Sequence, residues 1–292
     1  GLKMLSDRSY DLVIVMMRIA DMDPITFGEK VKAEFPDKPV ILLAFDESEI
    51  TALPQTRLRK TIDKVFIWSG NANVFPAIIK NIEDRENWRR DYEIADIRAI
   101  IIVEDDPRYY SIILPLIYRT ALKHARNLIN KSLSDTDKLL VFRARPKVIL
   151  VSTYEEAVEL YDKYRHNILG LISDVRFPKN DELDIHAGVK LASYVREKDS
   201  DMPVVLQSTN PDHMKDAKKV NASFIHKNSH TLLQDLEDFI VNSFGFGDFI
   251  FRDKRRKEIA RASDMNSLRY HLGKITEKSL EYHASNNHFS NW

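Results

Sequence analysis

The stretch ILGLISDVRFP (168–178) contains an apolar run that ends in an acidic residue, Asp174. Short and nearly continuous apolar runs of this kind are typical of parallel strands that are buried on both faces. Similar runs occur along the whole chain: DLVIVM (11–16), PVILLAF (39–45), KVFIW (64–68), IRAIIIV (97–103), KVILVS (147–152), MPVVLQS (202–208) and ASFIHK (222–227). Stretches with helical spacing separate most of them, so we predict an α/β fold built on parallel sheets.

Polar side chains follow the strands of the second half of the chain. Glu104 and Asp105 come after strand 97–103, and Asp174, Ser208 and Lys227 stand at the ends of the last three strands. The carboxyl ends of parallel strands open onto one edge of the sheet, so these side chains should converge. Clustered carboxylates suit Mg²⁺, and an adjacent ammonium neutralises phosphoryl oxygens. Asp174 can then act as a nucleophile that forms an acyl phosphate.

The order of these residues resembles that of the response-regulator receiver family over residues 97–242. The segment ISDVRFP is similar to the acceptor strand of that family and puts Asp174 at the phospho-acceptor position. MPVVLQST puts Ser208 at the switch hydroxyl, and ASFIHK puts Lys227 at the lysine and Phe224 at the aromatic switch position. The resemblance implies a doubly wound parallel five-stranded sheet of the flavodoxin-like order 2-1-3-4-5.

The resemblance also implies a chemistry and a partner. The chain would take a phosphoryl group from a histidine kinase or a phosphotransfer protein onto Asp174, with Mg²⁺ as cofactor. The metal ligands would be Glu104, Asp105, Asp174 and the main-chain carbonyl of Arg176. No enzymatic reaction beyond phosphorylation and dephosphorylation of the receiver itself is expected. By contrast, Asp106 stands before Pro107 and is better explained as a helix-capping acid.

The first part of the chain resembles a receiver that lacks this chemistry. Aligning YDLVIVMMRIADMDPITF with the acceptor strand puts Met16 where the aspartate should be, and Ala44 and Trp68 replace the hydroxyl and the lysine. A thioether forms no acyl phosphate. We therefore expect an incomplete pseudo-receiver at residues 1–73, with a possible role in homodimer formation. Strand 11–16 would be an exposed sheet edge that needs a cover.

The remaining segments complete the predicted organisation. A charged helical segment (74–96) links the two units, the receiver domain (97–242) carries long insertions, and residues 243–292 form a small α+β extension with a hairpin and helices. Pro115 is expected to kink the first receiver helix. The insertion KNDELDIHA (179–187) should reshape the entrance beside the acceptor.

The extension resembles the region that precedes a pyruvate/phosphoenolpyruvate-binding dikinase-like module, which would make the chain the regulatory part of a larger protein cut at both ends. Its histidines, His271, His283 and His288, fit no common zinc spacing, and structural roles explain them better. The KRRK run (254–257) reads as a solvated hairpin turn.

The amino-acid composition argues against several other classes of protein. Lys+Arg and Asp+Glu are both 44, so no net charge attracts nucleic acid or an anionic membrane. The chain has no cysteine and no apolar run of transmembrane length, which favours a cytoplasmic protein. The leading hypothesis is a phosphorylatable receiver module of two-component signal transduction. The alternatives are an interaction scaffold that is never phosphorylated, and a regulatory fragment of a phosphoenolpyruvate synthase-like enzyme.

Overall fold

The computed structural model describes residues 1–292 except 20, 131–144, 254, 256 and 287. The chain divides into two compact units, Gly1–Glu83 with Asp106–Pro115 and Asp84–Asp105 with Leu116–Trp292. Helices α5 (Val74–Ala95) and α6 (Pro107–Asn130) each begin in the first unit and end in the second. The four segments predicted from the sequence divide the chain more finely and stay a prediction.

The first unit is a small α/β unit with a three-stranded parallel sheet. The strands are β1 (Val13–Met16), β2 (Val40–Ala44) and β3 (Lys64–Ile67), in the order β1-β2-β3. The helices are α1 (Leu2–Asp7), α2 (Pro24–Glu34), α3 (Glu47–Thr51) and α4 (Gln55–Thr61), followed by the start of α5. Every residue of the central strand β2 is buried. Among the described strands β1 pairs only with β2, so it lies at the sheet edge, as predicted.

The second unit is built on a five-stranded parallel sheet. Its strands are β4 (Ala99–Val103), β5 (Lys147–Val151), β6 (Ile168–Asp174), β9 (Val204–Ser208) and β10 (Ser223–His226). The order across the sheet is β10-β9-β6-β4-β5, and all four pairings are parallel. Numbered along the chain, this is the order 2-1-3-4-5, so the predicted fold class is confirmed.

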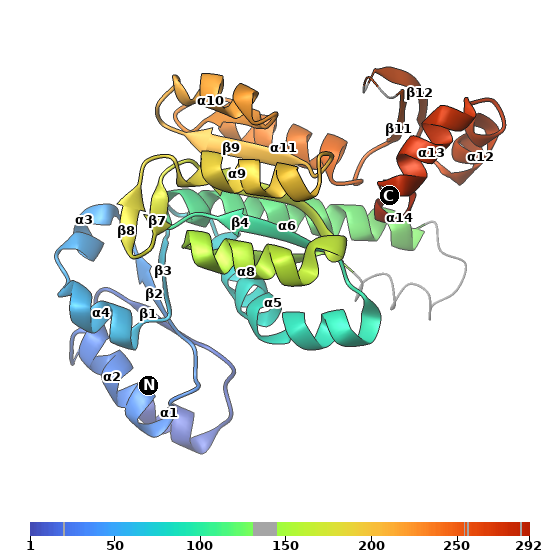
Figure 1. Cartoon of the computed structure of the whole chain (residues 1–292). Coiled ribbons are helices and arrows are strands. Elements are labelled where there is room, and N and C mark those ends of the chain that lie inside the picture. Colours follow the sequence, from blue (N-terminus) through green and yellow to red (C-terminus); the bar gives the residue numbers. More distant parts are fainter. Residues whose placement is uncertain (20, 131–144, 254, 256, 287) are drawn as a thin grey trace. The chain divides into compact units, whose positions relative to one another are not determined.

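Helices cover both faces of this sheet (Figure 1). They are the second part of α6, α8 (Tyr154–Tyr164), α9 (Ala187–Lys198), α10 (His213–Lys219) and α11 (Leu232–Ser243), with a short 3₁₀ helix η1 (Arg165–Asn167) after α8. Ile101 of β4 shares a core with Tyr161 of α8 and Leu191 of α9. Because neighbouring strand residues point to opposite faces, the equally buried Ile100 and Ile102 face the other layer. A two-sided core explains why the strands read as continuous apolar runs.

Local sequence signals fix where several helices begin. Thr153 and Glu156 form a capping box at the start of α8, in which the Thr153 hydroxyl accepts from the Glu156 backbone N and the Glu156 carboxylate accepts from the Thr153 backbone N. Helix α6 continues through Pro115, where a kink was predicted. The segment 131–144 that follows α6 lies outside the described residues. Among the described residues, no helix combines the length and the apolar character that crossing a membrane requires.

The C-terminal extension contains the predicted hairpin and helices. Strands β11 (Phe249–Arg252) and β12 (Glu258–Ala262) pair antiparallel. Three helices follow: α12 (Met265–Leu272), α13 (Glu277–Ser285) and α14 (His288–Asn291). Phe249, Phe251, Ala262 and Leu268 form their shared core. Lys254 and Arg256 of the predicted charged turn lie outside the described residues.

Candidate functional site

The polar residues predicted at the strand ends lie at one edge of the five-stranded sheet. In register, Val103 pairs with Ser173 and Asp174 pairs with Gln207, so β4, β6 and β9 end at the same level. His226 of β10 pairs with Ser208 of β9, and Lys227 follows directly. Parallel pairing therefore brings Glu104, Asp105, Asp174, Ser208 and Lys227 to the carboxyl edge of the sheet. This is the edge at which doubly wound sheets bind ligands.

Three carboxylates gather at this edge. Glu104, Asp105 and Asp174 each offer an oxygen, and these oxygens all lie within 4.8 Å of one another. Glu104 is buried, Asp174 is half-buried and Asp105 is exposed. Among the residues that the structure describes, no other trio of His, Cys, Asp or Glu side chains lies close enough to hold a metal ion. Carboxylate oxygens in such a cluster are ligands that suit a hard divalent cation.

A buried ammonium connects two of these carboxylates. Lys227 Nζ lies 2.6 Å from Glu104 Oε2 and 2.9 Å from Asp174 Oδ2. Burial by itself lowers the pKa of a lysine, but the two carboxylates more than offset it, so the pKa of Lys227 is raised. Lys227 is thus held as a cation beside Asp174.

The backbone around Asp174 is fixed from two sides. The Val175 backbone N donates to Asp174 Oδ1 at 2.7 Å, which orients the carboxylate. Gly188, near the start of α9, packs so closely that a Cβ atom there would lie 2.0 Å from the Asp174 carbonyl oxygen. Its own backbone N donates to the Val175 carbonyl at 2.9 Å. Only glycine allows this approach. Gly188 cannot be recognised as a site residue from the sequence, because only its position in space reveals the contact.

Ser208 is buried at the end of β9 and makes two hydrogen bonds. Its Oγ accepts from the Asn210 backbone N at 3.1 Å and lies 2.8 Å from Nδ1 of His213. His213 is a second residue that the sequence analysis missed, because a histidine five positions after a serine is no recognised motif. Phe224 is half-buried on β10 and packs against the core beneath α8 and α9.

Two further residues that the sequence singles out adjoin the same strand ends. Arg176 is exposed in the turn after β6. Asp106 stands directly before α6, where its Oδ1 accepts from the Arg108 backbone N at 2.9 Å. The capping role expected for Asp106 matches this geometry.

The inserted segment beside Asp174 forms a small antiparallel hairpin. Strands β7 (Phe177–Lys179) and β8 (Glu182–Asp184) flank a turn whose central residues, Asn180 and Asp181, have φ values of 52° and 63°. Asn and Asp tolerate this left-handed conformation, which two-residue hairpin turns require. The Asn180 backbone N donates to Glu155 Oε1 at 3.1 Å, and Lys190 pairs with Asp184 at 2.6 Å. The hairpin is therefore held to both α8 and α9.

The first unit has apolar side chains at the comparable strand ends. Met16 ends β1, Ala44 ends β2, and Trp68 follows β3. The Trp68 ring centroid lies 5.9 Å from that of Phe45 and 5.7 Å from that of Phe75. An aromatic cluster therefore occupies part of this edge.

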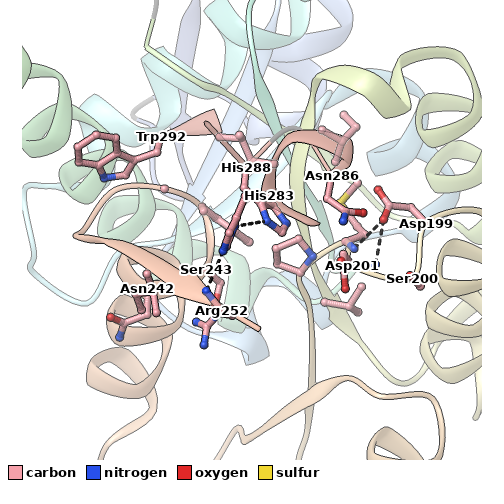
Figure 2. Close-up of a pocket in the computed structure, with 18 of the residues that line it drawn as sticks. Asp199, Ser200, Asp201, Asn242, Ser243, Arg252, His283, Asn286, His288 and Trp292 are labelled. Atoms are coloured by element: carbon pink, nitrogen blue, oxygen red, sulfur yellow. Dashed lines mark hydrogen bonds between the residues drawn. The ribbon is translucent and has the colours of Figure 1, made fainter. Parts of the chain in front are cut away.

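A cavity of about 720 Å³ lies at the opposite edge of the five-stranded sheet, near the first residues of β6 and β9 (Figure 2). The C-terminal extension lines it with His283 and His288. The buried His283 accepts from the Arg252 backbone N at 2.7 Å through Nε2, and its Nδ1 lies 2.9 Å from Nδ1 of His288. Burial first, and then nearby His288 and Arg252, lower the pKa of His283 to about 4. These contacts join the hairpin to α13 and α14, away from Asp174.

Comparisons with known proteins show similarity to solved structures. No protein-family model matches the chain, and no curated protein matches it significantly. Among solved structures, the chain is similar to a response regulator receiver domain protein from Clostridium thermocellum, with 16% sequence identity and a TM-score of 0.37. The similarity covers 51% of this chain and 95% of that chain.

Proposed function

We propose that residues 97–242 act as a phospho-acceptor receiver module of two-component signal transduction, with Asp174 as the acceptor. The observation that carries the proposal is the buried Lys227, whose Nζ lies 2.9 Å from Asp174 Oδ2 within a cluster of three carboxylates. A carboxylate beside a fixed cation and a metal-ligand set has what phosphoryl transfer needs, namely a nucleophile and positive charge for the phosphoryl oxygens. No further enzymatic reaction is proposed for this chain.

The transfer forms one bond and breaks one. A carboxylate oxygen of Asp174 attacks the phosphorus of a phosphohistidine carried by a histidine kinase or a phosphotransfer protein. The P–N bond breaks, and its electron pair remains on the imidazole nitrogen of the donor. The Lys227 ammonium sits where it can neutralise a phosphoryl oxygen as this happens. Hydrolysis of the acyl phosphate by water returns the free carboxylate.

The donor set of the site fits Mg²⁺. Three carboxylates face one ammonium, so the cluster carries excess negative charge that a divalent cation balances. Glu104, Asp105, Asp174 and the main-chain carbonyl of Arg176 would hold the ion. When bound, Mg²⁺ draws charge from the phosphoryl oxygens and makes them a better target for the carboxylate.

Phosphorylation would act on the surface around β9 and β10. Ser208 would turn toward the phosphoryl group, and the half-buried Phe224 on the adjacent strand would move with it. Such a modification biases a two-state equilibrium that exists without it. The first unit would take no phosphoryl group, since Met16 stands at its corresponding strand end, and would serve in contacts between chains.

The test is the formation of an acyl phosphate. The purified chain is incubated with acetyl phosphate and Mg²⁺, and the covalent adduct is measured by intact mass spectrometry. Beryllofluoride, which mimics the phosphoryl group, is titrated in parallel. We expect wild type to gain one phosphoryl group and Asp174→Asn to gain none. Omission of Mg²⁺ should reduce the adduct strongly.

Asp181→Asn is the matched control. Asp181 is exposed in the β7–β8 turn, and asparagine tolerates its left-handed backbone. This variant should be phosphorylated like wild type. A wild type without adduct under all these conditions would contradict the proposal and favour a scaffold that is never phosphorylated.

A further inference from the structure

The hydroxyl of Ser208 is hydrogen-bonded to a side chain at the start of α10. Ser208 Oγ lies 2.8 Å from Nδ1 of His213, the first residue of α10. The Asn210 backbone N donates to the same oxygen at 3.1 Å. Only 6% of Ser208 is exposed, so water competes little for either bond. The resting hydroxyl therefore has a defined orientation toward α10.

The imidazole of His213 is itself held in place. Its ring packs edge-on against that of His186, the residue before α9, with a centroid distance of 5.9 Å. The His213 backbone N donates to the Asn210 carbonyl at 3.3 Å, which fixes the start of α10 relative to the loop. On the far side of the loop, His226 Nε2 bonds the Thr209 carbonyl at 2.9 Å. Rotation of Ser208 must therefore break its bond to a side chain that is already ordered.

The two interactions of Ser208 compete. A serine hydroxyl has one proton to donate, and its oxygen occupies one rotamer at a time. A hydroxyl that donates its proton to a phosphoryl group on Asp174 cannot also donate it to His213. The net free energy of one buried hydrogen bond corresponds to about a fivefold change in an equilibrium constant.

We propose that His213 is a positioning residue that holds the Ser208 hydroxyl in its resting orientation and thereby opposes the switch to the phosphorylated conformation. This inference rests on the proposed function of Asp174. His213 touches neither the acceptor nor a metal ligand among its hydrogen-bond and ring contacts described above. It acts through Ser208, on the resting side of the equilibrium.

The test is a set of beryllofluoride titrations of the full chain in the presence of Mg²⁺. His213→Phe keeps a ring against His186 and removes the hydrogen bond, and His213→Ala removes both. We expect each variant to bind beryllofluoride about fivefold more tightly than wild type, because the resting state has lost one hydrogen bond. His213→Asn retains a polar atom near the position of Nδ1 and should bind like wild type. A role in folding alone would not produce tighter binding, since loss of folded protein weakens it.

Testing His213→Phe in Ser208→Ala protein shows whether His213 acts through the Ser208 hydroxyl. In Ser208→Ala protein, adding His213→Phe should change the beryllofluoride affinity by less than a factor of about two, because no hydroxyl remains to be held. Equal affinities of wild type, His213→Phe and His213→Ala would overturn the inference and leave the proposed function intact. The same would follow if His213→Phe had an equal effect with and without Ser208. Failure of wild type to bind beryllofluoride would refute the proposed function, and the inference with it.

Discussion

Lys227 Nζ lies closer to Glu104 Oε2, at 2.6 Å, than to Asp174 Oδ2, at 2.9 Å. Glu104 and Lys227 are both buried, so the Lys227 ammonium is paired mainly with Glu104 rather than with Asp174. A cation shared in this way compensates the acidic cluster before any metal or phosphoryl group arrives. Lys227 and a bound Mg²⁺ would therefore repel each other, and both would compete for the same carboxylates.

Lys227→Met should bind Mg²⁺ at least about tenfold more tightly than wild type, because it removes a positive charge from beside two carboxylates of the proposed metal site. The variant should also lose stability, since the buried Glu104 carboxylate is left without its cation, and Mg²⁺ should restore part of that stability. Calorimetric Mg²⁺ titration and thermal unfolding with and without Mg²⁺ measure these effects. Lys218→Met on the exposed side of α10 is the control and should match wild type. Weaker Mg²⁺ binding by Lys227→Met would contradict the charge argument.

Gly188→Ala should disturb the backbone at Asp174. The added Cβ would lie 2.0 Å from the Asp174 carbonyl oxygen and 2.9 Å from the Val175 Cα, so main-chain atoms must move apart. We expect a loss of about 1–3 kcal/mol in the free energy of unfolding and weaker beryllofluoride binding. Gly273→Ala is the matched control, because the nearest atom to its Cβ is 3.8 Å away. Denaturant unfolding measures the free energy of unfolding of both variants. Equal values would show that the loop after Asp174 can move to accommodate the added methyl group.

The strands of the second unit and the polar residues at their ends are predictable from the sequence. Strand β4 reads as an unbroken apolar run because both of its faces are buried, and the acidic pair Glu104 and Asp105 begins where that run ends. The same reasoning leads to Asp174 and Lys227. Parallel pairing then brings these residues together without further information.

Other parts of the site depend on contacts that no local pattern encodes. Strands β7 and β8 have three residues each, too few to show alternation, and only the Asn180–Asp181 turn signals the hairpin. The need for glycine at position 188 follows from the approach of another chain segment. His213 meets Ser208 because the loop between them folds back, and its spacing alone has no meaning.

Asp84→Asn should destabilise the second unit strongly. Asp84 is fully buried on α5, where its Oδ1 lies 2.7 Å from Arg145 Nη2 and its Oδ2 accepts from the Val148 backbone N at 2.9 Å. Removing its charge leaves Arg145 poorly compensated in a buried place, which costs about 3–5 kcal/mol. The double variant Asp84→Leu with Arg145→Met removes both charges and should lose less stability than Asp84→Asn. Urea unfolding measures the stability of wild type, Asp84→Asn and the double variant. A double variant no more stable than Asp84→Asn would contradict this account.

An exposed ion pair provides the comparison for that result. Glu258 and Arg261 lie 3.1 Å apart on the extension, with nearly half of each side chain exposed. Exposed pairs of this kind contribute little to stability. Glu258→Gln should therefore unfold at the same urea concentration as wild type. A large loss of stability in Glu258→Gln would mean that charge pairs on this surface contribute more to stability than their exposure indicates.

His283 should make the stability of the extension depend on pH. Its pKa is lowered from 6.5 to about 4 in the folded chain, so the unfolded chain binds the proton more readily. The neutral histidine therefore makes its full contribution to folding stability above about pH 6.5, and this contribution is lost as the pH falls toward about 4. His283→Gln removes the titration and can still accept from the Arg252 backbone N. Between about pH 7 and about pH 4.5, the stability of wild type relative to His283→Gln should fall by about 2 kcal/mol. Urea unfolding at both pH values measures the difference, with the exposed His230→Gln as control. A difference that stays constant with pH would show that His283 does not titrate on unfolding.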